Sequence, residues 1–155
     1  MHTGFNHKIK SELLNQCLSY VNQRQERILD TISDIQESLT SETKSTAGDK
    51  HETGRAMLQL EREKAGVQLA EVKKLQEIVN KIDTSPSSAV IRLGSLVETS
   101  QERYFLSISI GKLIIGDQTY FAIAANTPIG KLLLGKKVDD RIHFNGKDFK
   151  ITKIE

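Results

Sequence analysis

The sequence has few of the residues that mark secreted, disulfide-bonded or nucleic-acid-coating proteins. It contains one cysteine, two prolines and no tryptophan among 155 residues. Because a single cysteine cannot form an internal disulfide, we expect Cys17 to pack as a small hydrophobic side chain. Charged residues make up 27% of the chain, yet the net charge is only +2. So small an excess does not favour a protein that coats nucleic acid.

Long apolar runs are missing as well. Residues 1–10 lack the seven or more consecutive apolar residues of a signal peptide. No stretch of about 18 apolar residues could span a bilayer. We therefore expect a cytoplasmic protein that makes no contact with membranes.

The first half of the chain carries two heptad patterns separated by a short polar link. In the first pattern the stripe positions alternate in steps of four and three: Leu14, Leu18, Val21, Gln25, Ile28, Ile32, Ile35 and Leu39. The second pattern is weaker: Leu58, Arg62, Ala65, Leu69, Val72, Gln76 and Val79. Each helix can bury its stripe only on the other, so we predict an antiparallel coiled-coil hairpin over residues 1–84. We predict its first helix over residues 6–41 and its acidic tip near residues 48–52.

The tip carries two acidic residues, Asp49 and Glu52. Asp49 is a good N-cap for the second helix, and Glu52 follows at the spacing of a capping box. These structural roles compete with a functional one, because two carboxylates three residues apart share one face of a helix. His51 lies between them, but no second His or Cys stands nearby at ligand spacing. We therefore expect no metal site in the isolated chain.

The composition changes after a linker at residues 84–88. β-branched and aromatic runs predict strands at Ala89–Leu93, Leu96–Glu98, Arg103–Ile110, Lys112–Ile115 and Thr119–Ala125. Thr127 and Pro128 predict the start of a short helix that Gly135 closes. Asn145-Gly146 joins two further strands, Arg141–Phe144 and Lys147–Ile154, as a hairpin. We therefore predict an α+β fold in which residues 85–155 form a small antiparallel sheet domain with one short helix.

Two segments, GDKHETGRA from Gly48 onward and TPIGKLLLGKKVDD at Thr127–Asp140, together resemble motifs of the GreA/GreB family of bacterial transcript cleavage factors. The segment Thr127–Asp140, TPIGKLLLGKKVDD, looks like that family's Ser-Pro…-Leu-Gly-Lys-Lys-Val-Gly-Asp signature, with Asp139 in place of its usual Gly. At the tip the family carries Gly-Asp-Leu-Lys-Glu-Asn-Ala-Glu-Tyr, and this chain has GDKHETGRA from Gly48 onward. Both acids fall in register with the family's acids.

The resemblance implies a transcription elongation factor that binds RNA polymerase and inserts its coiled coil into the secondary channel. There Asp49 and Glu52 would act in trans on polymerase-held Mg²⁺, close to the 3′ end of the nascent RNA. The polymerase itself would cleave the RNA, so the chain would be a monomeric accessory factor without a cofactor of its own. The C-terminal half would be FKBP-like and would bind the polymerase through the signature residues Pro128, Ile129, Gly130, Lys131, Gly135, Lys136 and Lys137.

Two other functions stay open. The tip departs from the family pattern at Lys50, Thr53 and Arg55-Ala56, which is compatible with a factor that enters the channel and regulates transcription without cleavage. A coiled-coil adaptor would use the helical seam alone, and Asp49 and Glu52 would then be simple caps. A self-contained enzyme is not expected, because the chain has no Ser-His-Asp order, no CxxC pair and no phosphate-binding glycine loop.

Overall fold

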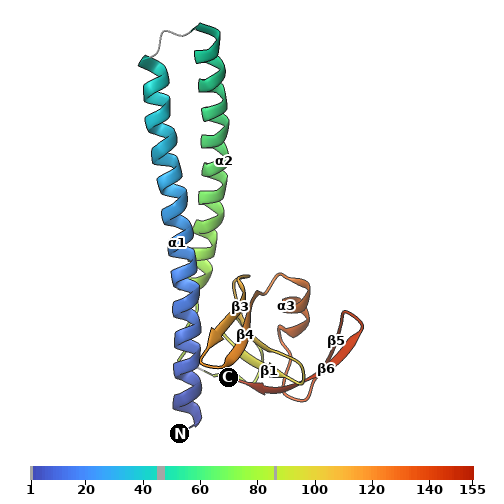
Figure 1. Cartoon of the computed structure of the whole chain (residues 1–155). Helices are drawn as coiled ribbons and strands as arrows, with labels where there is room; N and C mark the ends of the chain where they lie inside the picture. The colour runs from blue at the N-terminus through green and yellow to red at the C-terminus, as the bar shows by residue number, and fades with distance from the viewer. Residues whose placement is uncertain (1, 45–47, 86) are drawn as a thin grey trace. The chain divides into compact units, whose positions relative to one another are not determined.

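A computed structural model describes the backbone of residues 2–44, 48–85 and 87–155, and the side chains within 8–41, 52–85 and 87–155. Two long helices, α1 (His2–Lys44) and α2 (Gly48–Asn80), precede a six-stranded sheet and the short helix α3 (Pro128–Leu133) (Figure 1). The predicted α+β fold is confirmed. The chain divides into a sheet unit, residues 1–20 with 77–155, and a coiled-coil unit, residues 21–76. The predicted domain boundary between residues 84 and 85 stays a prediction.

In the coiled-coil unit α1 and α2 lie side by side and run in opposite directions (Figure 1). The buried side chains occupy predicted heptad positions: Val21, Ile28 and Ile35 from α1, and Ala65 and Val72 from α2. Gln25 and Gln76 sit in the same seam, where Gln76 Nε2 donates to Gln25 Oε1 at 2.6 Å. A polar pair at seam positions favours one register, because any slip leaves both amides without their partner.

The helix ends differ from the predicted ones by a few residues. We predicted the first helix over residues 6–41, and α1 runs from His2 to Lys44. Near this end the Thr40 hydroxyl donates to the Gln36 carbonyl at 3.0 Å, which satisfies the side chain within the helix. α2 begins at Gly48, which makes Asp49 a helical residue rather than the N-cap. Its side chain lies outside the described residues, as do residues 45–47 of the predicted link.

The six strands form one sheet in the order β3-β4-β2-β1-β6-β5. Their bounds are β1 (Leu96–Thr99), β2 (Arg103–Ser107), β3 (Gly111–Ile115), β4 (Gln118–Ala124), β5 (Arg141–Phe144) and β6 (Lys147–Ile154). The pairings are antiparallel, as predicted, except for one. β4 pairs in parallel with β2, with Tyr104 opposite Phe121, while β3 pairs outside it as the antiparallel edge strand. After β2 the chain crosses to the edge of the sheet and forms β3. It then turns back and forms β4 between β3 and β2, so β4 runs in the same direction as β2.

The segment predicted as a strand at Ala89–Leu93 forms a single bridge instead. Val90 pairs with Lys137, and the Arg92 N–H donates to Ser95 Oγ at 2.9 Å in a turn. Because this turn redirects the backbone, a longer ladder cannot continue. The β5–β6 hairpin is confirmed, with Asn145 and Gly146 at φ values of 54° and 75°. Both angles fit the type I′ turn that Asn-Gly favours.

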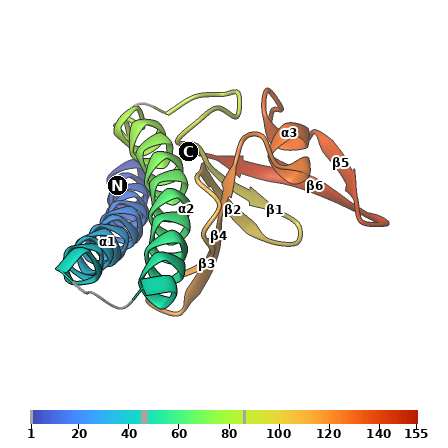
Figure 2. The same cartoon turned by 90° about the horizontal axis from the view of Figure 1, so that it is seen from above.

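The sheet has a hydrophobic core on each face. On one face α3 packs near β4 and β5 (Figure 2), over a cluster of buried side chains: Ile91, Val97, Leu106, Ile129, Leu133, Ile142, Phe149 and Ile151. Alternate strand residues such as Phe105, Leu113 and Tyr120 are buried on the opposite side. Cys17 of α1 is fully buried there, with Sγ 3.7 Å from Ser107 Oγ. The part of α1 around Cys17 therefore belongs to the sheet core.

This packing changes the start of the first heptad stripe. Leu13 and Cys17 are fully buried, whereas the predicted Leu14 and Leu18 are only half-buried. The reason is that this part of α1 packs on the sheet, where Gln16 Nε2 donates to the Ile114 carbonyl and Cys17 lies against Ser107, so its buried face is turned by one residue. The expectation that Cys17 packs as a hydrophobic side chain is confirmed. Within the described ranges, none of the helices combines the length and the apolar character needed to cross a bilayer.

Candidate functional site

The first candidate site is the connected end of the coiled-coil unit. Both predicted acids lie within the first turns of α2, and the Glu52 side chain is exposed to solvent. Residues 21–44 of α1 rise by about 1.5 Å each, so the link lies roughly 36 Å along the helix from Val21. The carboxylate of Glu52 is thus presented at one end of an extended helix pair. An exposed carboxylate of this kind can accept hydrogen bonds or contribute an oxygen ligand to a cation held by a partner.

The second candidate site is the segment around α3 in the sheet unit. Thr127 caps the helix: its Oγ1 accepts from the Gly130 N–H at 3.1 Å and donates to the Ala124 carbonyl at 2.7 Å. Pro128 is the first helical residue, where its missing N–H costs nothing. The predicted N-cap and helix start are confirmed. This double hydrogen bond fixes how α3 leaves β4.

Several of the predicted partner-binding residues serve the packing of α3. Ile129 and Gly130 are buried, and a Cβ on Gly130 would lie 2.1 Å from the Ala124 carbonyl oxygen. Gly135 has a φ of +83° and its N–H donates to the Ile91 carbonyl at 2.8 Å. These three positions therefore have structural roles. Pro128, Lys131 and Lys137 are exposed and Lys136 is half-buried, so these four can reach a partner.

Beside the exposed lysines lie three exposed apolar side chains, Val90, Leu134 and Val138, which we call the α3 patch. The strand bridge from Val90 to Lys137 brings the two segments together, and the Ile91 N–H donates to the Lys136 carbonyl at 2.9 Å. Ile129 and Leu133 face the core while Leu134 faces solvent. The patch thus combines apolar surface with nearby cations, a combination suited to protein docking.

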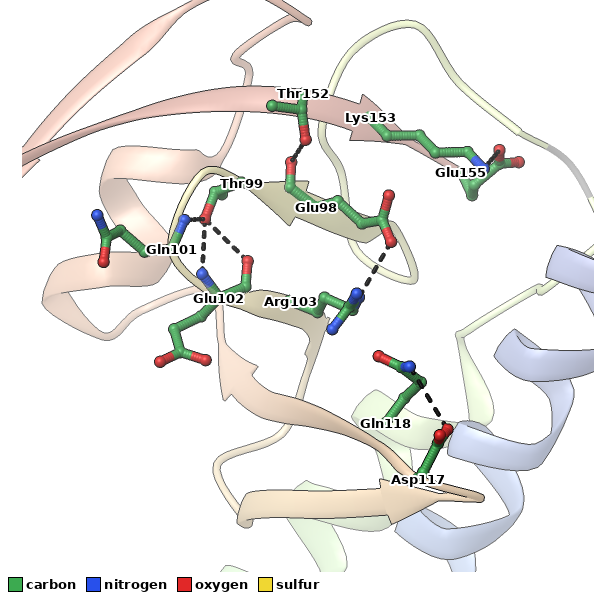
Figure 3. A network of polar contacts seen from close by, with 10 residues as sticks. All are labelled: Glu98, Thr99, Gln101, Glu102, Arg103, Asp117, Gln118, Thr152, Lys153 and Glu155. Carbon is green, nitrogen blue, oxygen red and sulfur yellow. Dashed lines mark hydrogen bonds and ion pairs between the residues drawn. The ribbon is translucent and has the colours of Figure 1, made fainter.

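A third polar region surrounds the β1–β2 turn (Figure 3). It is a shallow hollow of about 360 Å³, lined by Glu98, Thr99, Ser100, Gln101, Glu102, Arg103 and Thr152. Its polar groups bond to one another. Arg103 Nε pairs with Glu98 Oε1 at 3.1 Å, and Thr99 Oγ1 accepts from the Glu102 N–H at 3.0 Å. These bonds shape a hydroxyl-capped turn, and they account for the hollow without a ligand.

Cys17 and His143 lie in opposite environments, because the first is fully buried and the second is exposed. Burial raises the pKa of the Cys17 thiol, which keeps it protonated and unreactive. His143 lies on β5 and is exposed, with Nδ1 2.7 Å from Asp148 Oδ1. Nowhere in the described part of the chain do three or more His, Cys, Asp or Glu side chains group so that they could hold a metal ion.

Comparison with models of known protein families found no match to this chain, and comparison with curated proteins found none either. The family resemblance rests on the motif residues of the tip and of the α3 segment.

Proposed function

We propose that this protein is a Gre-like transcription elongation factor. It would bind RNA polymerase, insert its coiled-coil unit into the secondary channel and stimulate cleavage of backtracked RNA. The observation that carries the proposal is the antiparallel helix pair with Asp49 and Glu52 in the first turns after its link. A helix pair reaching roughly 36 Å beyond Val21 is longer than stability requires, and such a reach suits delivery of a tip into a narrow channel.

The chemistry would belong to the polymerase, and this chain would be an accessory factor. A polymerase Mg²⁺ supplies Lewis-acid assistance to phosphodiester hydrolysis. Mg²⁺ prefers oxygen ligands, and the carboxylates of Asp49 and Glu52 offer them three residues apart on one helix. Two carboxylates are too few to hold the ion alone, which is why the proposal gives the chain no cofactor of its own. At that position the acids would lie close to the 3′ end of the nascent RNA.

The sheet unit would dock on the polymerase through the α3 patch and its lysines. Leu134 is the single residue of the Leu132–Leu134 run that is exposed, so a partner can cover it without disturbing the core. Substitution Leu134→Asp should weaken polymerase binding of the full chain by roughly tenfold, since a desolvated Leu contributes on the order of 1.5–3 kcal/mol. Unchanged binding would remove the α3 patch from the proposed interface.

A channel regulator without cleavage activity is the second candidate. It is favoured by the tip itself, because Lys50 and Arg55 reduce the negative charge around the two acids and Ala56 stands where the family has Tyr. Such a factor would bind the same channel and alter initiation or pausing. A coiled-coil adaptor is the third, and it would be insensitive to the charge of Asp49 and Glu52.

One experiment separates these functions. Backtracked elongation complexes are incubated with Mg²⁺ and the protein, and the RNA is resolved on a gel. We expect short 3′ fragments with the wild type and none with Asp49→Asn/Glu52→Gln, which keeps hydrogen-bonding groups but removes both charges. Equal cleavage by both proteins would exclude the acids. Polymerase binding without cleavage by either protein would favour the regulator, and absence of binding would favour the adaptor.

A further inference from the structure

An exposed apolar stripe runs along α2 in the coiled-coil unit. Met57, Leu60 and Val67 are 59%, 65% and 61% exposed, and among the described residues of α2 no other large hydrophobic side chain is exposed. On a helix with 3.6 residues per turn the three fall within a sector of about 80°, together with Lys64. The buried Ala65 and Val72 lie roughly a third of a turn away, so α1 does not cover this sector. We call these three residues the α2 stripe.

The α2 stripe repeats the spacing of a coiled-coil seam. Met57, Leu60, Lys64 and Val67 follow one another in steps of three, four and three. On an ordinary solvated helix face these positions would be polar, as the other exposed positions of α2 are apart from the small Ala56 and Ala70. The stripe therefore has the pattern of a surface that packs against another ridge of side chains.

A second copy of this chain is a poor occupant of the stripe. Antiparallel packing centred between Leu60 and Lys64 would place Glu61 against its own counterpart, and likewise Glu63. Parallel packing would place Lys64 against itself. The apolar surface of the three side chains is on the order of 300 Å², well short of the ~800 Å² per partner of a standard interface. Like charges and small area both oppose self-association through this face.

The charges point to a different partner chemistry. Glu61 and Glu63 flank the stripe on its two sides, and both side chains are exposed. A matching surface would present apolar side chains between cationic ones, with an acceptor opposite Lys64. We infer that the α2 stripe packs against an apolar, cation-flanked ridge on the wall of the polymerase secondary channel. This inference rests on the proposed function, and it makes one side of the inserted helix pair a contact surface in addition to the tip.

The test compares two variants of the full-length protein that gain the same charge on adjacent residues. Leu60→Glu places the charge in the stripe, and Gln59→Glu places it on an exposed polar side of α2 away from the stripe. Binding to purified RNA polymerase is measured by fluorescence anisotropy. We expect Leu60→Glu to weaken binding by roughly tenfold or more and Gln59→Glu to change it less than about twofold. Leu60→Ala, which keeps helix propensity, should weaken binding in the same direction.

The outcomes distinguish this inference from the proposed function. If the wild type binds and cleavage depends on the tip acids, yet Leu60→Glu and Leu60→Ala bind normally, the stripe is not a contact surface and the function stands. Equal losses from Gln59→Glu and Leu60→Glu would show a general effect of charge and would also overturn the inference. If the wild type does not bind polymerase, both the function and the inference fail. A photo-crosslinking residue at position 60 that labels polymerase, with none at position 59, would support the contact directly.

Discussion

Gly130 offers the sharpest test of how α3 is held on the sheet. A Cβ at this position would lie 2.1 Å from the Ala124 carbonyl oxygen, 2.9 Å from Thr127 Oγ1 and 3.0 Å from Ala125 Cα. The nearest of these atoms is backbone, so it cannot rotate away. Gly130→Ala therefore requires α3 to move by about 1 Å, and overpacking of this kind costs about 1–3 kcal/mol. The same movement breaks the Thr127 cap, which is worth about 1 kcal/mol.

We therefore expect Gly130→Ala to lower the free energy of unfolding of the sheet unit by about 2–4 kcal/mol. Urea denaturation followed by tyrosine fluorescence measures this, because the chain has no tryptophan and its three tyrosines, Tyr20, Tyr104 and Tyr120, belong to the sheet unit. Gly66→Ala in α2 is the matched control. Its Cβ would meet only the end of the Arg62 side chain at 3.2 Å. Helix propensity should then stabilise the coiled-coil unit by up to about 1 kcal/mol, so the urea midpoint that the tyrosines report for the sheet unit should not fall.

An unchanged urea midpoint for Gly130→Ala would refute the steric argument. It would also return Gly130 to the set of residues whose role is to contact a partner. A loss of polymerase binding with full stability would have the same meaning.

Three further predictions concern positions elsewhere in the chain. Asp139 has a φ of +77° and its Oδ1 lies 3.1 Å from Lys150 Nζ. Asp139→Gly should relieve the backbone strain while losing this exposed ion pair, so the free energy of unfolding should change by less than about 1 kcal/mol. Asp139→Val should lower it by more than that in urea denaturation, because a β-branched residue fits a positive φ poorly. Burial raises the pKa of the Cys17 thiol, so as the pH rises the unfolded chain loses this proton before the folded protein does. Loss of the proton favours the unfolded state. Between pH 8 and 10 the free energy of unfolding should therefore fall more for the wild type than for Cys17→Ala. The native thiol should also react with a thiol reagent far more slowly than the urea-unfolded chain, and equal rates would contradict its burial.

Local patterns predicted most of the elements, because their causes lie within a few residues. The Thr127 cap is one example, because its hydroxyl needs only the N–H three residues later. The Asn145-Gly146 turn is another, because both residues readily adopt a positive φ. Neither depends on the rest of the fold. The buried seam positions Val21, Ile28 and Ile35 follow from helical periodicity in the same way.

Features that depend on distant parts of the chain were not predictable. Strand patterns show which side chains face a core, but they do not show which strand lies next to β2, so the parallel pairing with β4 was missed. The burial of Cys17 against Ser107 of β2 joins residues that are 90 apart in sequence. The α3 segment shows the same limit at the candidate site. A sequence signature does not separate Ile129 and Gly130, which pack in the core, from Lys131 and Lys137, which face solvent.

The sheet unit is discontinuous in sequence, because residues 1–20 and 77–155 both belong to it. During synthesis Cys17 of α1 emerges long before β2, whose Ser107 lies against it. The intervening residues 21–76 can form their helix pair early, since its contacts need only these two helices. The helix pair brings residues 21 and 76 close together before the sheet has formed. The loop between the two segments of the sheet unit is then already closed, so the later docking of α1 on the sheet costs less conformational entropy. In refolding followed by pulsed hydrogen exchange, amides of the coiled-coil unit should therefore gain protection before those of β4.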